Sequence, residues 1–171
     1  IAGDIKLGKA FVKELIPWIY STHVSYDHIG QARSMRRRIE ERAETLDLKA
    51  GFGGFCDIEF LVQHLQLLYG GRYKDLRNQT TIESLRLLMQ HGLLPSEEVQ
   101  ELIEYYSWLR MAEHRLQMLE SRQLHEVPTE EVALQSLAHR CGFEGKDASE
   151  DFLAHMHSVR KNVREIADRH Y

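Results

Sequence analysis

The sequence predicts an all-α fold, a bundle of six or seven helices joined by short loops. Apolar side chains recur at three- and four-residue intervals through most of the 171 residues, which is the spacing of one helix face. Alternating runs rich in Val, Ile and Thr, which would indicate strands, are nearly absent, and the chain contains only three prolines. At most one very short strand is therefore expected, at residues 46–49.

Length, charge and cysteine content narrow the class of protein. The chain is long enough for one domain with a substantial core. We expect a single helical domain over 1–171, made of a linker and first helix (1–25), a central bundle (26–121) and C-terminal helices (129–171). The formal net charge of −4 attracts neither nucleic acid nor acidic lipid, and no apolar run reaches the roughly 18 residues that span a bilayer. Cys56 and Cys141 form no Cys-x-x-Cys motif and are interpreted as small buried residues of a reducing compartment, the cytoplasm.

Apolar stripes predict the first two helices. One stripe covers residues 11–19, and Pro17 is expected to end or kink that helix because proline lacks the backbone N–H. The second covers residues 26–43, where Ile29, Ala32, Met35, Ile39 and Ala43 repeat at helical spacing.

The outer face of the helix at 26–43 is rich in arginine and glutamate. Arg36 and Glu40, like Arg37 and Glu41, stand four residues apart and can form ion pairs along the helix. We interpret this face as solvated and paired with itself. The alternative is that its arginines bind phosphate.

A glycine-rich turn leads into the helix around which the rest of the chain is expected to pack. Gly51, Gly53 and Gly54 allow positive φ or a close approach to another surface, so a tight turn should enter a helix at 55–69. Apolar side chains cover most of that helix, which is therefore expected to be buried on several sides. The run Gly70-Gly71-Arg72 should close it with a left-handed stop.

Two acids interrupt this apolar helix. Asp57 can cap the helix start, where the helix dipole favours an anion, and Glu59 can pair with an arginine. Alternatively, both belong to a ligand or nucleotide site, since a buried carboxylate needs a partner. Two residues apart on a helix they diverge, so they cannot hold one Mg²⁺ unless Asp57 precedes the helix proper.

Capping patterns predict four later helices. They are a helix from a Thr80–Glu83 capping box to Gly92, one from an N-cap at Ser96 to about Ser121, one from an N-cap at Thr129 to Gly142, and a last helix after 144–149. The last helix should pack along the apolar seam Phe152, Met156, Val159, Val163 and Ile166.

Motifs for self-contained catalysis are missing. The sequence has no Gly-x-Ser-x-Gly, P-loop, His-Glu-x-x-His or long Rossmann fingerprint. His155 and His157 lie two residues apart and point in different directions, so they do not chelate one metal. We therefore predict no catalytic or metal-binding residue in this chain.

One long motif carries a resemblance to a known family. Residues 47–63, Asp-Leu-Lys-x-Gly-x-Gly-Gly-x-x-Asp-Ile-Glu-Phe-Leu-Val-Gln, resemble the segment that follows each nucleotidyltransferase domain in glutamine synthetase adenylyltransferase. The resemblance continues through most of the chain, in Leu65–Leu67, Gly70–Arg72, Leu76–Arg77, Gly92–Leu94, Leu109–Arg110, Glu113–Gln117, His125 and Pro128. Enzymes of this family attach AMP to glutamine synthetase and remove it.

The resemblance implies a non-catalytic helical domain of a longer enzyme. The family's transferase core carries a Gly-Ser and an Asp-x-Asp metal pair, which are missing here and are expected upstream of Ile1. The fragment alone should therefore be inactive and bind no cofactor, while Mg²⁺ and ATP are implied for the parent. The sequence Asp57-Ile58-Glu59 is more similar to the segment that follows the adenylylating core of the family. The sequence Gly70-Gly71-Arg72 is more similar to the segment that follows the deadenylylating core. The resemblance therefore leaves open which of the two cores this chain follows.

The resemblance also suggests a site. In one interpretation the turn at 49–54 faces the active-site cleft of the transferase core, Lys49 approaches phosphate or acidic residues, and Asp57 or Glu59 orients Lys49. In the alternative, the turn is an interdomain hinge whose glycines serve packing. The candidate residues are Lys49, Gly51, Gly53, Gly54, Asp57 and Glu59, with Arg36, Arg37 and Arg72 as possible anion or partner contacts. Expected partners are the upstream nucleotidyltransferase domain, glutamine synthetase and the signal protein PII. A pure interaction module for PII or glutamine synthetase, or an unrelated helical scaffold, are the alternatives.

Overall fold

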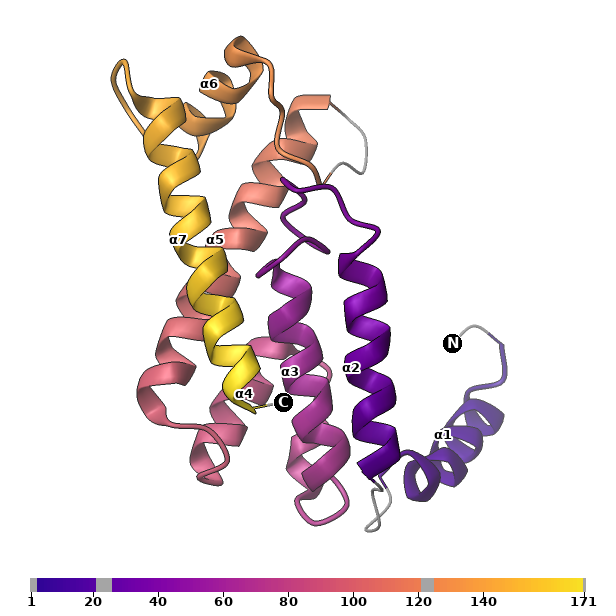
Figure 1. The fold of residues 1–171 in the computed structure, drawn as a ribbon. Helices are drawn as coiled ribbons and strands as arrows, with labels where there is room; N and C mark the ends of the chain where they lie inside the picture. Colours follow the sequence, from indigo (N-terminus) through magenta and orange to yellow (C-terminus); the bar gives the residue numbers. More distant parts are fainter. Residues whose placement is uncertain (1–2, 21–25, 121–124, 171) are drawn as a thin grey trace.

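A computed structural model describes residues 3–20, 26–120 and 125–170. Within these ranges the elements are α1 (Ile5–Ile19), α2 (Tyr26–Glu40), α3 (Phe55–Tyr69), the short 3-10 helix η1 (Lys74–Leu76), α4 (Thr81–Gln90), α5 (Ser96–Glu120), α6 (Glu131–Arg140) and α7 (Ala148–His170). The predicted all-α bundle is confirmed (Figure 1).

Helix α3 is the centre of the bundle, as the sequence predicts. It packs against α2, α4, α5 and α7, which lie around it in Figure 1. Its core side chains are Phe55, Ile58, Leu61, Val62 and Leu65, all buried. A helix with neighbours on several sides needs apolar residues over most of its circumference, which is the pattern that this segment carries.

The last helix, α7, runs along most of the bundle and closes it against α3, α5 and α6. All five residues of its predicted seam are buried: Phe152, Met156, Val159, Val163 and Ile166. The ring of Phe152 lies 5.8 Å from that of Trp108 on α5 and 5.7 Å from that of Phe143. The spacing of apolar residues was therefore sufficient to identify the face that α7 buries.

The segment at 46–49 forms no strand in the described part of the chain. It contributes one isolated antiparallel bridge, between Asp47 and Glu126. Two flanking backbone hydrogen bonds, from Leu48 to His125 (2.8 Å) and from Val127 to Leu46 (3.1 Å), attach this loop to the residues before α6. The short strand expected at 46–49 is thus reduced to one extended contact.

Two predicted helix ends are wrong by a few residues. Helix α1 continues through Pro17 to Ile19, because a proline in the last turn removes only one hydrogen bond. Helix α2 ends at Glu40, before Ala43, as Arg42 and Ala43 donate to carbonyls three residues back and tighten the chain into a turn.

Several predicted helix caps are also wrong. Thr80 precedes α4 but makes no capping hydrogen bond; its hydroxyl donates to Asn78 instead (2.8 Å). Helix α5 already includes Ser96, and α6 is capped by Glu130 in place of Thr129. Gly92 and Gly142 do follow their helices, as predicted, and both have positive φ.

Gly70 ends α3 with φ −65° and ψ −16°, which is right-handed, so the predicted left-handed stop is wrong. Glycine is needed there for space, since a Cβ would lie 2.6 Å from the ring of Tyr20. Tyr20 follows α1 and thus attaches the end of that helix to the bundle.

Candidate functional site

The glycine turn is held rigidly at the N-terminus of α3. Asp47 Oδ1 accepts hydrogen bonds from the backbone N–H groups of Lys49 (2.7 Å) and Ala50 (2.8 Å), which folds the chain just before the glycines. Cys56 N–H then donates to the carbonyl of Lys49 (3.1 Å). Most of the polar backbone groups of this turn therefore have partners inside the domain.

The glycines allow the turn to touch the backbone of α7. Gly53 has φ +67°, and a Cβ built on it would lie 1.9 Å from the carbonyl oxygen of Arg160. A Cβ on Gly51 would lie 2.6 Å from the Arg160 guanidinium. The buried Arg160 in turn donates to the carbonyls of Phe52 (2.6 Å) and Thr45 (2.8 Å). The close approach expected from the sequence is thus an approach to α7.

Asp57 lies at the first turn of α3 and is 1% exposed. Its carboxylate accepts a hydrogen bond from Gly53 N–H (3.0 Å) and pairs with Arg36 of α2. Arg164 of α7 approaches the same carboxylate at 3.6 Å. Asp57 therefore links the glycine turn to α2 and α7. Its buried negative charge is neutralised by the arginines that contact it.

Arg36 is only 6% exposed, so the prediction of a fully solvated arginine face is wrong at this residue. It bridges Asp57 and Glu40, and the predicted pair with Glu40 is confirmed. The predicted pair of Arg37 with Glu41 is confirmed too, at 3.1 Å, and is exposed. One arginine of this face is a buried structural residue, because it pairs with the buried Asp57 of α3.

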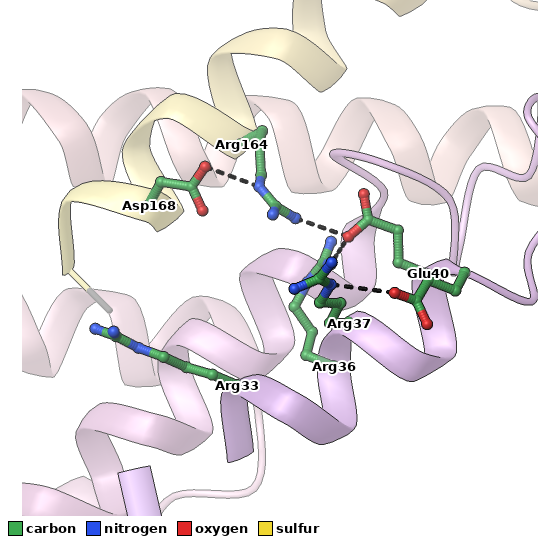
Figure 2. Close-up of a pocket in the computed structure, with 7 residues that line it drawn as sticks. Arg33, Arg36, Arg37, Glu40, Arg164 and Asp168 are labelled. Atoms are coloured by element: carbon green, nitrogen blue, oxygen red, sulfur yellow. Dashed lines mark hydrogen bonds and ion pairs between the residues drawn. The ribbon is translucent and has the colours of Figure 1, made fainter. Parts of the chain in front are cut away.

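A groove of about 750 Å³ lies beside this network, between α2 and the C-terminal part of α7 (Figure 2). Its lining residues are Arg33, Arg36, Arg37, Glu40, Glu41, Arg164 and Asp168. Arg164 donates to Glu40 (3.1 Å) and to Asp168 (2.9 Å), while Arg33 extends away from these pairs. The arginines are thus largely matched by the groove's own acids and Asp57.

Glu40 is held ionised in this groove. Burial raises the pKa of its carboxyl, but hydrogen bonds and charges from Arg36 and Arg164 outweigh burial and bring the pKa below its ordinary value. The side chains that line the groove therefore form a network of ion pairs, and this network joins α2 to α7.

Glu59 points to another side of α3. It accepts a hydrogen bond from the hydroxyl of Tyr106 on α5 (2.9 Å), so the expectation of an arginine partner is wrong. Asp57 and Glu59 therefore face different helices, and their side chains diverge as their spacing predicts. Among the described residues, no cluster of three His, Cys, Asp or Glu could hold a metal ion.

Comparison with known proteins places the chain in a family. Residues 29–170 match the family model described as GlnD PII-uridylyltransferase. The chain belongs to this family. Three curated relatives, each named bifunctional glutamine synthetase adenylyltransferase/adenylyl-removing enzyme, come from Rhizobium meliloti (38% identical over 84% of this chain), Mesorhizobium japonicum (33% over 100%) and Corynebacterium efficiens (32% over 99%). The resemblance to the adenylyltransferases is therefore confirmed.

This member of the GlnD PII-uridylyltransferase family spans only 15% to 17% of the length of those three relatives. It thus corresponds to one domain of a larger adenylyltransferase chain. No helix in the described ranges is long and apolar enough to cross a membrane.

The remaining predicted site residues of this family member lie apart from the network. Lys49 is partly exposed, and neither Asp57 nor Glu59 forms an ion pair with it in the part of the chain that the structure describes. Arg72 is exposed and lies over the ring of Tyr73, 5.1 Å from its centroid. The structure therefore gathers Asp57, Arg36 and the glycines, and leaves Lys49, Glu59 and Arg72 outside.

Arg160 and Arg164 are the important residues that the sequence analysis missed. Arg160 lies one turn after Met156, on the same buried face of α7 as the apolar seam. A charged residue at such a position indicates a buried partner. That signal was present in the sequence.

His64, buried on α3, gives this domain a pH dependence that can be tested. Burial and then the charge of Arg33 hold the pKa of the imidazole below its ordinary value. In the unfolded chain this imidazole binds a proton at about pH 6.5, and in the folded chain it does so only at lower pH. The free energy of unfolding should therefore decrease as the pH is lowered through about 6.5. Replacing His64 by Gln should flatten that fall, measured by urea unfolding between about pH 7.5 and pH 5.

The exposed His157 on α7 is the matched control. His157→Gln should leave the pH dependence unchanged. If His64→Gln and wild type lose stability in parallel as the pH falls, another group is responsible.

Proposed function

We propose that this chain is a helical domain of a bifunctional glutamine synthetase adenylyltransferase/adenylyl-removing enzyme, and that it supports a nucleotidyltransferase domain without supplying catalytic groups. The parent would use Mg²⁺ and ATP, bound by its transferase domain, to modify glutamine synthetase, with PII as a regulator. The observation that carries the non-catalytic role is the internal pairing of the two candidate acids. Asp57 is neutralised by Arg36, and Glu59 is held by Tyr106.

This pairing supports a scaffolding role on physical grounds. A carboxylate that acts as general base or metal ligand needs a free lone pair directed at substrate or metal. The Asp57 carboxylate is nearly inaccessible and already accepts from Gly53 and Arg36. Its contribution in the parent would be to hold the glycine turn, α2 and α7 in one shape against which another domain can rest.

Two substitutions outside the buried ion pair test the proposal in the full-length parent. Lys49→Met and Glu59→Gln should each leave the incorporation of labelled AMP from Mg-ATP into glutamine synthetase within about threefold of wild type, since neither residue touches reacting atoms. Lys74→Met and Glu104→Gln, both at exposed positions, are the matched controls.

A loss of about 100-fold or more in either test variant, with folding intact, is the size expected of a general acid, base or phosphate ligand. That outcome would place the substituted residue, Lys49 of the glycine turn or Glu59 of α3, in the active site and overturn the non-catalytic role. Circular dichroism spectra and unfolding midpoints of the same preparations establish whether the fold is intact.

A further inference from the structure

Helix α1 is strongly two-sided. One half of its circumference is apolar and carries Ile5, Leu7, Phe11, Val12, Leu15, Ile16, Trp18 and Ile19. The other half carries Ala10, Lys6, Lys9, Lys13 and Glu14, with the three lysines along the edge that borders Ile5 and Ile16.

The apolar half is exposed. Ile5, Leu7, Phe11 and Trp18 are 67%, 69%, 61% and 80% exposed, and α1 contains no buried residue. Figure 1 shows α1 at the edge of the molecule, beside α2 and away from the core around α3. Over Gly8, a hollow of about 230 Å³ lies between Ile5, Lys9 and Val12, a shape that accepts a side chain from outside.

Such a helix does not persist without a partner. An isolated helix of about 15 residues is marginal in water even when rich in alanine, and α1 contains Gly8 and Pro17 as well. Large apolar side chains gathered and exposed on one face are also typical of a surface that binds a partner. The apolar half of α1 therefore lacks the cover that would stabilise this helix.

The family comparison indicates which partner this is. The family model begins at residue 29, so α1 lies outside the unit that α2 to α7 form. The alignment with the Mesorhizobium relative nevertheless covers the whole chain, so α1 has a counterpart inside a polypeptide about six times longer. A domain in the same polypeptide is present at an effective concentration of the order of mM, far above that of a free partner.

We propose that α1 docks with its apolar half into an apolar groove on the neighbouring nucleotidyltransferase domain of the same polypeptide. The groove has acidic side chains along the rim that meets Lys6, Lys9 and Lys13. The α1 helix thus belongs to the interface between the two domains, and Tyr20 joins it to the bundle by packing against Gly70 and Arg77. This inference rests on the proposed function, because that function supplies the second domain.

Hydrogen exchange of the peptide covering residues 5–19 tests the docking. The amides of α1 should exchange at least about 100-fold more slowly in the full-length parent than in the 171-residue chain. Phe11→Asp in the parent should abolish that protection, and the adjacent Ala10→Asp, on the polar half, should preserve it. Both variants introduce the same charge one residue apart, so the change in net charge is matched. Alanine is a better helix former than phenylalanine, so Ala10→Asp lowers helix propensity by more than Phe11→Asp, and a loss of protection in Phe11→Asp alone cannot arise from propensity.

Four results would overturn the proposal. They are equal exchange in the parent and the 171-residue chain, protection that rises with the concentration of the 171-residue chain alone, protection that needs phosphatidylglycerol vesicles, and protection of the parent that needs added glutamine synthetase or PII. The proposed function fails separately, if a parent with protected α1 transfers no AMP to glutamine synthetase.

Discussion

Replacing Gly53 by alanine is expected to destabilise the domain by about 3 kcal/mol or more, one of the two largest effects predicted for a single substitution here. Two causes add at this position. The φ of +67° strains any residue with a Cβ, and the new methyl group would lie 1.9 Å from the carbonyl oxygen of Arg160 and 2.5 Å from its carbonyl carbon. Because these atoms belong to the backbone of α7, the contact can be relieved only by moving the turn or that helix. Urea unfolding of the variant and wild type measures the loss.

Gly92 supplies a matched control. It has the same φ of +67°, but a Cβ there would meet nothing within 4 Å. Gly92→Ala should therefore cost only the backbone strain, about 1 kcal/mol. The difference between the two variants isolates the close approach of the turn to α7. Equal losses would show that this approach contributes nothing beyond the φ requirement.

The overall fold was predictable because its signals are local. Apolar spacing identified the helices, the seam of α7 and the central place of α3, since each helix must bury its apolar face. The density of glycines likewise predicted a turn that another surface approaches. It could not predict that this surface is Arg160, because the two segments meet only after α7 has packed against α3.

Helix caps were less predictable, since several polar side chains compete for the same backbone groups. Thr80 has the sequence of a capping box, but Asn78 accepts both its N–H and its hydroxyl at 2.8 Å. At α6 the carboxylate of Glu130 accepts from two backbone N–H groups, which displaces Thr129 from the capping role. Both outcomes depend on side-chain geometry that residue types do not determine.

Pairing of the candidate site residues was predictable only within a helix. The pairs of Arg36 with Glu40 and Arg37 with Glu41 follow from their spacing along α2. The spacing is identical for both pairs, however, and gives no indication that the first pair is largely buried and the second lies in solvent. Burial of Arg36 depends on Asp57 from α3, and so it arises only in the folded tertiary structure.

Arg36→Met is the second substitution with a large expected effect. It would keep an unbranched side chain of similar length but leave the buried carboxylate of Asp57 without its closest cation, with only Arg164 at 3.6 Å. Removing one partner of a buried ion pair typically costs about 3–5 kcal/mol, because the remaining charge stays desolvated. Arg37→Met, which removes the exposed partner of Glu41, should cost no more than about 1 kcal/mol. The free energies of unfolding in urea give both values.

The double variant Arg36→Met with Asp57→Asn separates two contributions to the loss of stability. One is the lost attraction between Arg36 and Asp57, and the other is the cost of leaving the Asp57 carboxylate buried without its partner. Asparagine keeps an oxygen that can accept from Gly53 N–H but removes the negative charge, so the double variant should be more stable than Arg36→Met alone. The network around Glu40 and Arg164 would remain to join α2 to α7. If Arg36→Met is as mild as Arg37→Met and Asp57→Asn restores nothing, the arginine face of α2 behaves as a solvated surface. The junction of α2, α3 and α7 would then be held by apolar packing alone.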